Sequence, residues 1–135
     1  MIVGVCIDIV EIARVEDQVR RHGERFVNRL FAPEEIAYCK GKAHRAQHYA
    51  VRFAAKEAAF KALGTGWQDG LSWQEVVLMN DGAGQPFLAL RGRAKELADQ
   101  RGVRRAHVSL SHSDLWAAAV VVLEGSESAS GEGAR

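Results

Sequence analysis

Residues 46–63 read AQHYAVRFAAKEAAFKAL, and this alanine-rich stretch decides the fold. Alanine has the highest helix propensity, and its small side chain lets other elements approach a helix closely. Tyr49, Phe53 and Phe60 lie roughly along one side of such a helix. Gly64 follows the pattern in the position where a glycine commonly ends a helix. The sequence therefore predicts one long helix over residues 46–63, against which the rest of the chain packs.

The segments on both sides of this helix mix strand and helix patterns without a strict β-α-β order. Residues 2–12 are rich in Val and Ile and predict a strand. Because both faces of this strand are mostly apolar, we expect it in the centre of a sheet. The other expected elements are helices over 12–22, 33–40 and 92–101 and strands over 73–79, 85–90, 103–110 and 116–123. This mixture favours an α+β fold, with an antiparallel sheet packed against the long central helix and shorter helices.

Length and composition bound the class of protein. The chain has 135 residues, and we assign residues 1–124 to a single domain. Residues 125–135 lack any large apolar side chain, so we expect a disordered and dispensable tail. The net charge of +1 excludes a globally basic nucleic-acid-binding protein, and the N-terminal apolar run is too short for a membrane span. With no signal peptide, a cytoplasmic enzyme or binding domain is expected.

Two carboxylates stand where a charge is costly. Asp8 interrupts the apolar run Val3–Val10, and Glu57 lies in the alanine-rich helix. An unpaired carboxylate in either place costs several kcal/mol of desolvation, or it takes up a proton. A divalent cation shared by Asp8 and Glu57 relieves that cost, whereas an arginine partner or a capping role for Asp8 is the alternative.

Lys61 follows Glu57 by four residues, which leaves two interpretations open. The spacing and order favour a surface ion pair on one helix face, worth about 0.2–0.5 kcal/mol, and on spacing alone this is the better prediction. One helix turn also suits an arrangement in which Glu57 holds a cation and Lys61 reaches a phosphate.

The remaining polar motifs are weak by themselves. Gly64-Thr65-Gly66 follows a helix and lacks the spacing of a P-loop, although its glycines permit close approach to a ligand. Ser111 and His112 are neighbours on a strand, so they point to opposite faces and do not form a nucleophile–base pair; we prefer a ligand contact for His112.

Arg14, Arg20 and Arg21 gather near one face of the helix over 12–22. On charge alone a solvated helix face is the better interpretation, and a surface that docks an acidic partner is the alternative.

Three segments together resemble the holo-acyl-carrier-protein synthases, the short bacterial 4′-phosphopantetheinyl transferases. Residues 4–14 read GVCIDIVEIAR, residues 52–66 read RFAAKEAAFKALGTG, and residues 108–113 read VSLSHS before WAAAV at 116–120. The order and spacing of the segments agree with that family, and the likeness covers about residues 2–123. The central segment is the most specific of the three.

The resemblance implies transfer of 4′-phosphopantetheine from coenzyme A to a serine of apo acyl carrier protein, a step that serves fatty acid biosynthesis. Adenosine 3′,5′-bisphosphate is the other product. Asp8 and Glu57 are then the ligands of Mg²⁺, whose charge neutralises the diphosphate of coenzyme A. Lys61 contacts a phosphate during bond cleavage. Glu57 or a metal-bound water takes the serine proton, and the sequence does not choose between them.

The resemblance also implies the partners. Coenzyme A is expected to contact Arg45 and Arg52 through its 3′-phosphate. Its nucleotide is expected against a further set of residues, namely Gly64, Thr65, Gly66, Ser111 and His112. A homotrimer with active sites between subunits is expected, and the Arg14, Arg20 and Arg21 cluster becomes a docking surface for the acidic carrier protein. Neither nucleic acid nor a membrane is expected as a partner.

Two other functions stay open at the level of sequence. One is a different metal-dependent phosphohydrolase of nucleotides, which predicts turnover of coenzyme A without carrier protein. The other is a non-catalytic module that binds coenzyme A or carrier protein, which predicts binding without Mg²⁺-dependent transfer.

Overall fold

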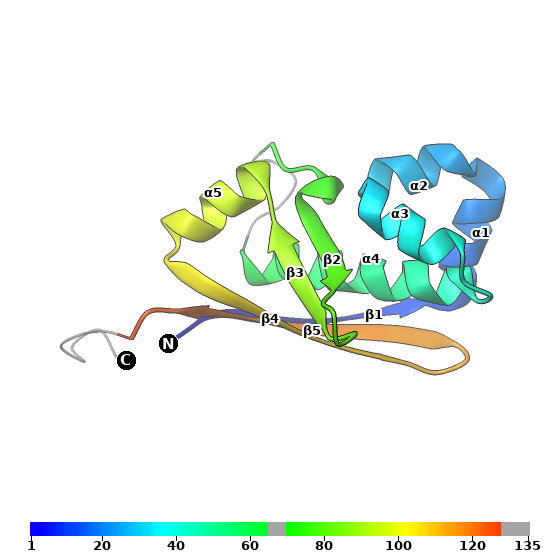
Figure 1. Ribbon diagram of the computed structural model, residues 1–135. Coiled ribbons are helices and arrows are strands. Elements are labelled where there is room, and N and C mark those ends of the chain that lie inside the picture. Colours follow the sequence, from blue (N-terminus) through cyan, green and yellow to red (C-terminus); the bar gives the residue numbers. More distant parts are fainter. Residues whose placement is uncertain (65–69, 128–135) are drawn as a thin grey trace.

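A computed structural model of the chain describes residues 1–64 and 70–127 and has the expected α+β fold (Figure 1). The helices are α1 (Ile12–His22), α2 (Glu24–Leu30), α3 (Pro33–Lys40), α4 (Arg45–Ala62) and α5 (Gly92–Gln100). The strands are β1 (Ile2–Glu11), β2 (Val76–Asn80), β3 (Pro86–Leu90), β4 (Val103–His112) and β5 (Trp116–Gly125). A short 3-10 turn at Trp73–Glu75 precedes β2, and α2 is a helix that the sequence patterns did not predict.

The elements form layers on one side of a sheet. Strands β1, β5 and β4 make a three-stranded antiparallel sheet in that order, and β2 and β3 form a separate hairpin. Figure 1 shows α4 lying along one face of the sheet, with α1, α2 and α3 gathered at one end of α4, the β2–β3 hairpin near its middle and α5 toward the other end. In the described parts of the chain no helix is both long enough and apolar enough to cross a membrane.

The central position expected for the first strand is wrong. Within residues 1–64 and 70–127, β1 is an edge strand that pairs with β5 alone. Its face away from α4 carries Val5, Ile7 and Ile9, which are 61%, 69% and 63% exposed. The alternating pattern correctly indicated two apolar faces, but this chain covers only one of them. The apolar residues on the outer face of β1 are therefore not explained by burial within this chain.

A close approach between β1 and α4 sets the geometry of the inner face. A side chain at Gly4 would place its Cβ only 2.1 Å from the carbonyl oxygen of Ala62, so only glycine fits there. The helix ends at Ala62, and Gly64 has a φ of 73°, which confirms its role just beyond the helix end. The last turns of α4 are thus held against β1.

The opposite side of α4 is held by a buried ion pair. Lys56 Nζ lies 2.6 Å from Glu35 Oε1, and both side chains are fully buried. Lys56 also donates to the carbonyl oxygens of Val76 and Trp73, at 2.5 and 3.1 Å. Burial lowers the pKa of Lys56, and the charge of Glu35 opposes that shift. This pair ties α4 to α3 and to the start of β2.

The end of the last strand lies slightly beyond its expected position. β5 continues through Gly125, whose N–H donates to the Met1 carbonyl oxygen at 2.7 Å. The expected tail therefore begins with a residue that belongs to the sheet, and residues 128–135 lie outside the described residues.

Candidate active site

Asp8, Glu57 and Lys61 meet where α4 crosses β1. Asp8 sits on the face of β1 that packs against α4, opposite Ala119 of β5, and its side chain is 10% exposed. Lys61 comes from the last turn of α4, and its Nζ lies 2.7 Å from Asp8 Oδ1. Asp8 and Lys61 are 53 positions apart in the sequence, yet a single chain brings them together as predicted.

Glu57 lies beside Asp8, one helix turn before Lys61. Burial raises the pKa of Glu57, and the negative charge of Asp8 together with a hydrogen bond to it raises that pKa further. The hydrogen bond and charge of Asp8 also raise the pKa of Lys61. The ion pair that spacing favoured, between Glu57 and Lys61, is replaced by one between Lys61 and Asp8. The reason is that β1 brings a carboxylate within reach of Lys61, which no pattern inside the helix reveals.

The donor set at this crossing suits a hard divalent cation. Two carboxylates face each other, and the ammonium group of Lys61 already lies against one of them as a stand-in cation. Within residues 1–64 and 70–127 no group of three or more His, Cys, Asp or Glu side chains is arranged to hold a metal ion. A metal here would therefore take two protein oxygens and complete its shell with water and phosphate oxygens, as Mg²⁺ commonly does.

A second set of polar residues surrounds Arg52 on another side of α4. Arg52 is only 3% exposed, and its guanidinium lies over the Tyr38 ring, 4.2 Å from the centroid. It donates to the His48 carbonyl oxygen and to Asn80 Oδ1, each at 3.3 Å, while its buried Nε has no partner among the described residues. A cation that has a free donor and no carboxylate salt bridge within residues 1–64 and 70–127 favours an anionic ligand nearby.

A small hollow of about 140 Å³ opens beside Arg52. Its polar lining comes from Gln47, His48, Asn80 and His112, and none of its lining residues is acidic. Gln47 forms a hydrogen bond with His112 of β4. Sequence analysis identified Arg52 and His112 as contact residues, but it missed Gln47 and His48 of α4 and Asn80 of β2, which share no motif.

Arg45 begins α4 and lies in a larger neighbouring hollow of about 650 Å³. Gln47 lines both hollows, so the hollow lined by Arg45 adjoins the one lined by Arg52, and the phosphate contacts of both arginines stay a prediction.

Each set has one residue on an edge strand of the sheet, while the other residues of both sets come mainly from α4. Asp8 is on β1 and His112 is on β4, with β5 between these strands. Neighbouring strands lie about 4.8 Å apart, so the two edges are separated by about 10 Å of backbone. Among the described residues, the hollow beside Arg52 is lined by none of Asp8, Glu57 and Lys61.

The remaining expected contact residues are spread over the molecule. Ser111 points to the opposite face from His112, away from α4. Gly64 lies at the end of α4, next to the guanidinium of Arg101, and Thr65 and Gly66 lie outside the described residues.

The arginines of α1 divide into two kinds. Arg20 and Arg21 both pair with Asp17, at 2.7 and 3.1 Å, which partly neutralises them. Arg14 instead lines an apolar groove of about 450 Å³ that reaches Glu57. The apolar lining of this groove includes Val10, Val15, Phe26, Phe53 and Trp116. The pairs of Asp17 are local i,i+3 and i,i+4 contacts within α1, and sequence analysis overlooked them. The groove was not predictable, because it depends on how α1, α2, α4 and β1 pack together.

Comparison with known proteins gives consistent results. Residues 4–121 match the family described as the 4′-phosphopantetheinyl transferase superfamily. A holo-[acyl-carrier-protein] synthase of Geobacter sp. strain M21 is 51% identical over 124 residues, covering 92% of this chain and 99% of that protein. The corresponding synthase of Koribacter versatilis is 44% identical over the same length, with the same shares covered.

Solved structures agree with the sequence relatives. The holo-[acyl-carrier-protein] synthase of Neisseria meningitidis has a TM-score of 0.84 and 31% identity, covering 92% of this chain and 99% of that one. The Helicobacter pylori synthase, determined in complex with coenzyme A, has a TM-score of 0.78 and 36% identity, covering 89% and 99%. The match spans nearly the whole described fold and includes the crossing of β1 and α4. This chain belongs to the 4′-phosphopantetheinyl transferase superfamily.

Proposed function

We propose that this protein transfers 4′-phosphopantetheine from coenzyme A to a serine of apo acyl carrier protein in the cytoplasm, releasing adenosine 3′,5′-bisphosphate. The observation that carries the proposal is the meeting of Asp8, Glu57 and Lys61 at one crossing of strand and helix. Two carboxylates and a lysine are the groups required to bind and cleave a diphosphate through a hard cation.

Asp8 and Glu57 would hold Mg²⁺, since they supply two adjacent carboxylates on a rigid strand and a rigid helix. The ion, when bound, supplies positive charge that neutralises the diphosphate and the charge that develops as its bond breaks. Lys61 is 55% exposed and ends at the solvent boundary, so its ammonium group can turn to a phosphate oxygen.

The groove between Arg14 and Glu57 suits the approach of the carrier protein. It joins a cationic side chain on α1 to the carboxylate at the crossing, and its apolar lining can receive side chains of a helix. The positive charges of Arg14, Arg20 and Arg21 would attract the acidic carrier protein. The ion pairs with Asp17 would weaken the attraction that Arg20 and Arg21 exert.

The complete site requires more than one chain, and we propose the homotrimer expected from the family resemblance. Two observations support this arrangement. Asp8 and His112 lie on opposite edge strands of the sheet, and the described residues that line the hollow beside Arg52 include neither Asp8 nor Glu57, so a neighbouring copy could bring the two sets into one coenzyme A site. The exposed apolar face formed by Val5, Ile7 and Ile9 also calls for cover by another surface.

A transfer assay tests the proposal directly. The protein is incubated with coenzyme A, Mg²⁺ and an apo acyl carrier protein, and the carrier is examined by mass spectrometry. The expected result is the mass gain of one phosphopantetheine group, and none when the acceptor serine of the carrier is replaced by alanine. Turnover of coenzyme A without any carrier would instead indicate a phosphohydrolase, and binding without transfer would indicate a non-catalytic module.

A further inference from the structure

The Lys61–Asp8 ion pair occupies Oδ1, one of the two oxygens of a carboxylate that the proposed metal site requires. Lys61 Nζ lies 2.7 Å from Asp8 Oδ1, which is the distance of a strong charge-assisted hydrogen bond. A cation coordinated by that oxygen and the ammonium group of Lys61 cannot both stay there, because like charges repel strongly at such separations.

The two partners differ in how easily they move. Asp8 is 10% exposed and belongs to a strand that is packed against α4, so its carboxylate stays in place. Lys61 is 55% exposed and carries its charge on a flexible four-carbon stem. Any exchange at this site is therefore a movement of Lys61 away from a fixed Asp8.

We propose that Lys61 closes the metal site in the ligand-free protein and couples binding of the divalent cation to binding of coenzyme A. A divalent cation alone must break the Lys61–Asp8 pair. The diphosphate of coenzyme A alone must also break it, since it draws Lys61 to a phosphate oxygen. When both bind, the pair is broken only once, so each ligand raises the affinity for the other.

Charge balance supports the same coupling. Asp8, Glu57 and Lys61 carry one net negative charge when all three are ionised. A divalent cation alone reverses the sign of this charge, and a diphosphate alone makes it more negative. The two together restore the original net charge, so the doubly occupied state avoids the repulsion present in either singly occupied state.

Titration of Mn²⁺, with the free ion measured by electron paramagnetic resonance, tests the inference, which rests on the proposed metal site. Without coenzyme A, Lys61→Met should bind Mn²⁺ about tenfold more tightly than wild type, because the competing ammonium group is gone. With saturating coenzyme A, where Lys61 has already left Asp8, the two affinities should agree within about twofold. A role limited to phosphate contact predicts no change in the first arm.

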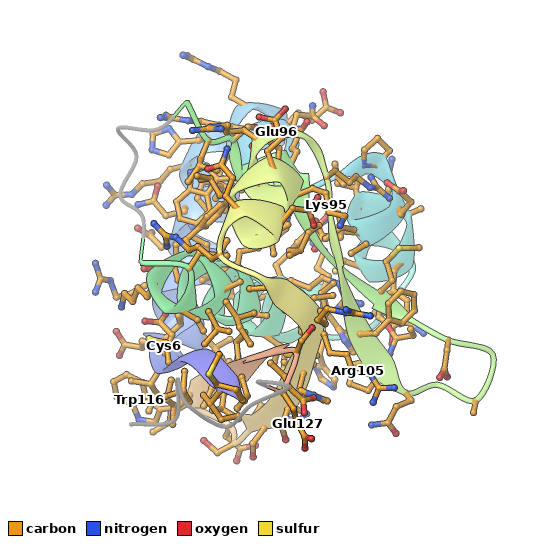
Figure 2. All side chains as sticks on the ribbon, turned by 90° about the vertical axis from the view of Figure 1, so that its left-hand side faces the viewer. Cys6, Lys95, Glu96, Arg105, Trp116 and Glu127 are labelled. Atoms are coloured by element: carbon orange, nitrogen blue, oxygen red, sulfur yellow. The ribbon has the colours of Figure 1, made fainter. Side chains whose placement is uncertain are left out.

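Control variants separate this effect from a general change in charge. Lys95→Met removes an exposed lysine that pairs with Asp99 on α5, and it should leave Mn²⁺ binding unchanged. Figure 2 shows Lys95 in a different part of the molecule from Cys6, which shares a face of β1 with Asp8. Lys61→Arg keeps the charge and should retain the weak binding of wild type, whatever Lys61→Met does to stability.

The outcomes distinguish the inference from the proposed site. Equal Mn²⁺ affinities of wild type and Lys61→Met without coenzyme A overturn the inference, while loss of binding in Asp8→Asn keeps the metal site. Unchanged binding in Asp8→Asn, with or without coenzyme A, overturns both. Failure of Lys61→Met to bind Mn²⁺ at all also overturns the inference.

Discussion

Two lysines of α4 pair with carboxylates on different sides of the helix, and the two pairs behave as opposites. On the closed side, toward α3 and β2, Lys56 meets Glu35, and both are fully buried. On the open side, toward β1, Lys61 meets Asp8, and the lysine is 55% exposed. The residue types and distances are alike, so the difference lies in the surroundings of each pair.

Hydrogen bonding explains the difference. On the closed side Glu35 accepts from the N–H groups of Ala32 and Leu78, and Lys56 donates to two backbone carbonyls. Every strong polar group there has a partner, so the pair can only be broken at a large cost. On the open side Glu57 adds a second carboxylate whose pKa is raised by burial and by Asp8. A satisfied pair holds the fold, whereas a pair with excess negative charge is ready to take a ligand.

Removing one partner on the closed side should give the largest effect. Lys56→Met leaves Glu35 buried without its counter-charge, which should lower the free energy of unfolding by about 3–5 kcal/mol. Denaturant unfolding at a fixed protein concentration measures this. The double variant Glu35→Gln/Lys56→Met keeps an acceptor for the backbone and should recover part of the loss. A decrease in the free energy of unfolding of less than about 1 kcal/mol would show that the Lys56–Glu35 pair does not stabilise the packing of α4 against α3.

Removing a carboxylate on the open side should affect activity and spare the fold. Asp8→Asn and Glu57→Gln should each lower kcat by about 10²–10³-fold, since each removes charge that stabilises the transition state. Their melting temperatures should stay at or above that of wild type, because the mutual repulsion of two carboxylates is relieved. Measurement of kcat against Mg²⁺ concentration should give only partial rescue. Near wild-type turnover with an unchanged Mg²⁺ dependence would contradict the assignment.

A charged substitution on the outer face of β1 tests whether another chain covers the strand that carries Asp8. Ile7 is 69% exposed in one chain, yet a trimer would bury it. Ile7→Asp should then weaken assembly by about 2 kcal/mol per chain and lower the mass seen in analytical ultracentrifugation. Phe87→Asp on β3, which is also exposed, serves as the control. An unchanged mass for Ile7→Asp would argue against an interface on this face.

Charge reversal on α1 should have a moderate effect that is specific to the carrier protein. Arg14→Glu/Arg21→Glu should raise KM for acyl carrier protein about tenfold and leave KM for coenzyme A nearly unchanged. Added salt should lower wild-type activity, because exposed charges act mainly on the encounter rate. Lys95→Glu on α5 reverses a charge elsewhere and should not alter either constant. Unaltered carrier kinetics in the double variant would remove α1 from the docking surface.

Shortening the chain should have the smallest effect, since residues 125–135 carry no large apolar side chain that could anchor them to the core. A chain ending at Glu127 should keep its melting temperature and its turnover. A chain ending at Glu124 loses the hydrogen bond between Gly125 and Met1 and should lose about 1 kcal/mol of stability. Loss of activity after removal of residues 128–135 would show that the tail takes part in function.

Much of the fold and of the site was predictable because it depends on local patterns. The long helix needed only alanine-rich sequence, and the hairpin of β2 and β3 only a glycine-containing turn between apolar runs. Asp8 and Glu57 stood out because a charge in an apolar stretch is costly wherever the chain goes. The match to the family, residues 4–121, includes these segments.

Other features needed the folded chain. The edge position of β1 depends on the pairing of residues more than 100 positions apart, as in Asp8 opposite Ala119. Lys61 pairs with Asp8 instead of Glu57 because the close contact between Gly4 and Ala62 brings β1 against the end of α4. The hollow beside Arg52 collects residues from α3, α4, β2 and β4.

The sequence by itself determined which residue types carry the chemistry and most of the segments that form helices and strands, with α2 as the exception. Only the tertiary structure decided which charges distant in the sequence pair, which pair is buried with all its partners, and which stays open. The physical reason is that propensity and periodicity act within a few residues. Desolvation and hydrogen bonding instead depend on neighbours that folding brings together from distant parts of the chain.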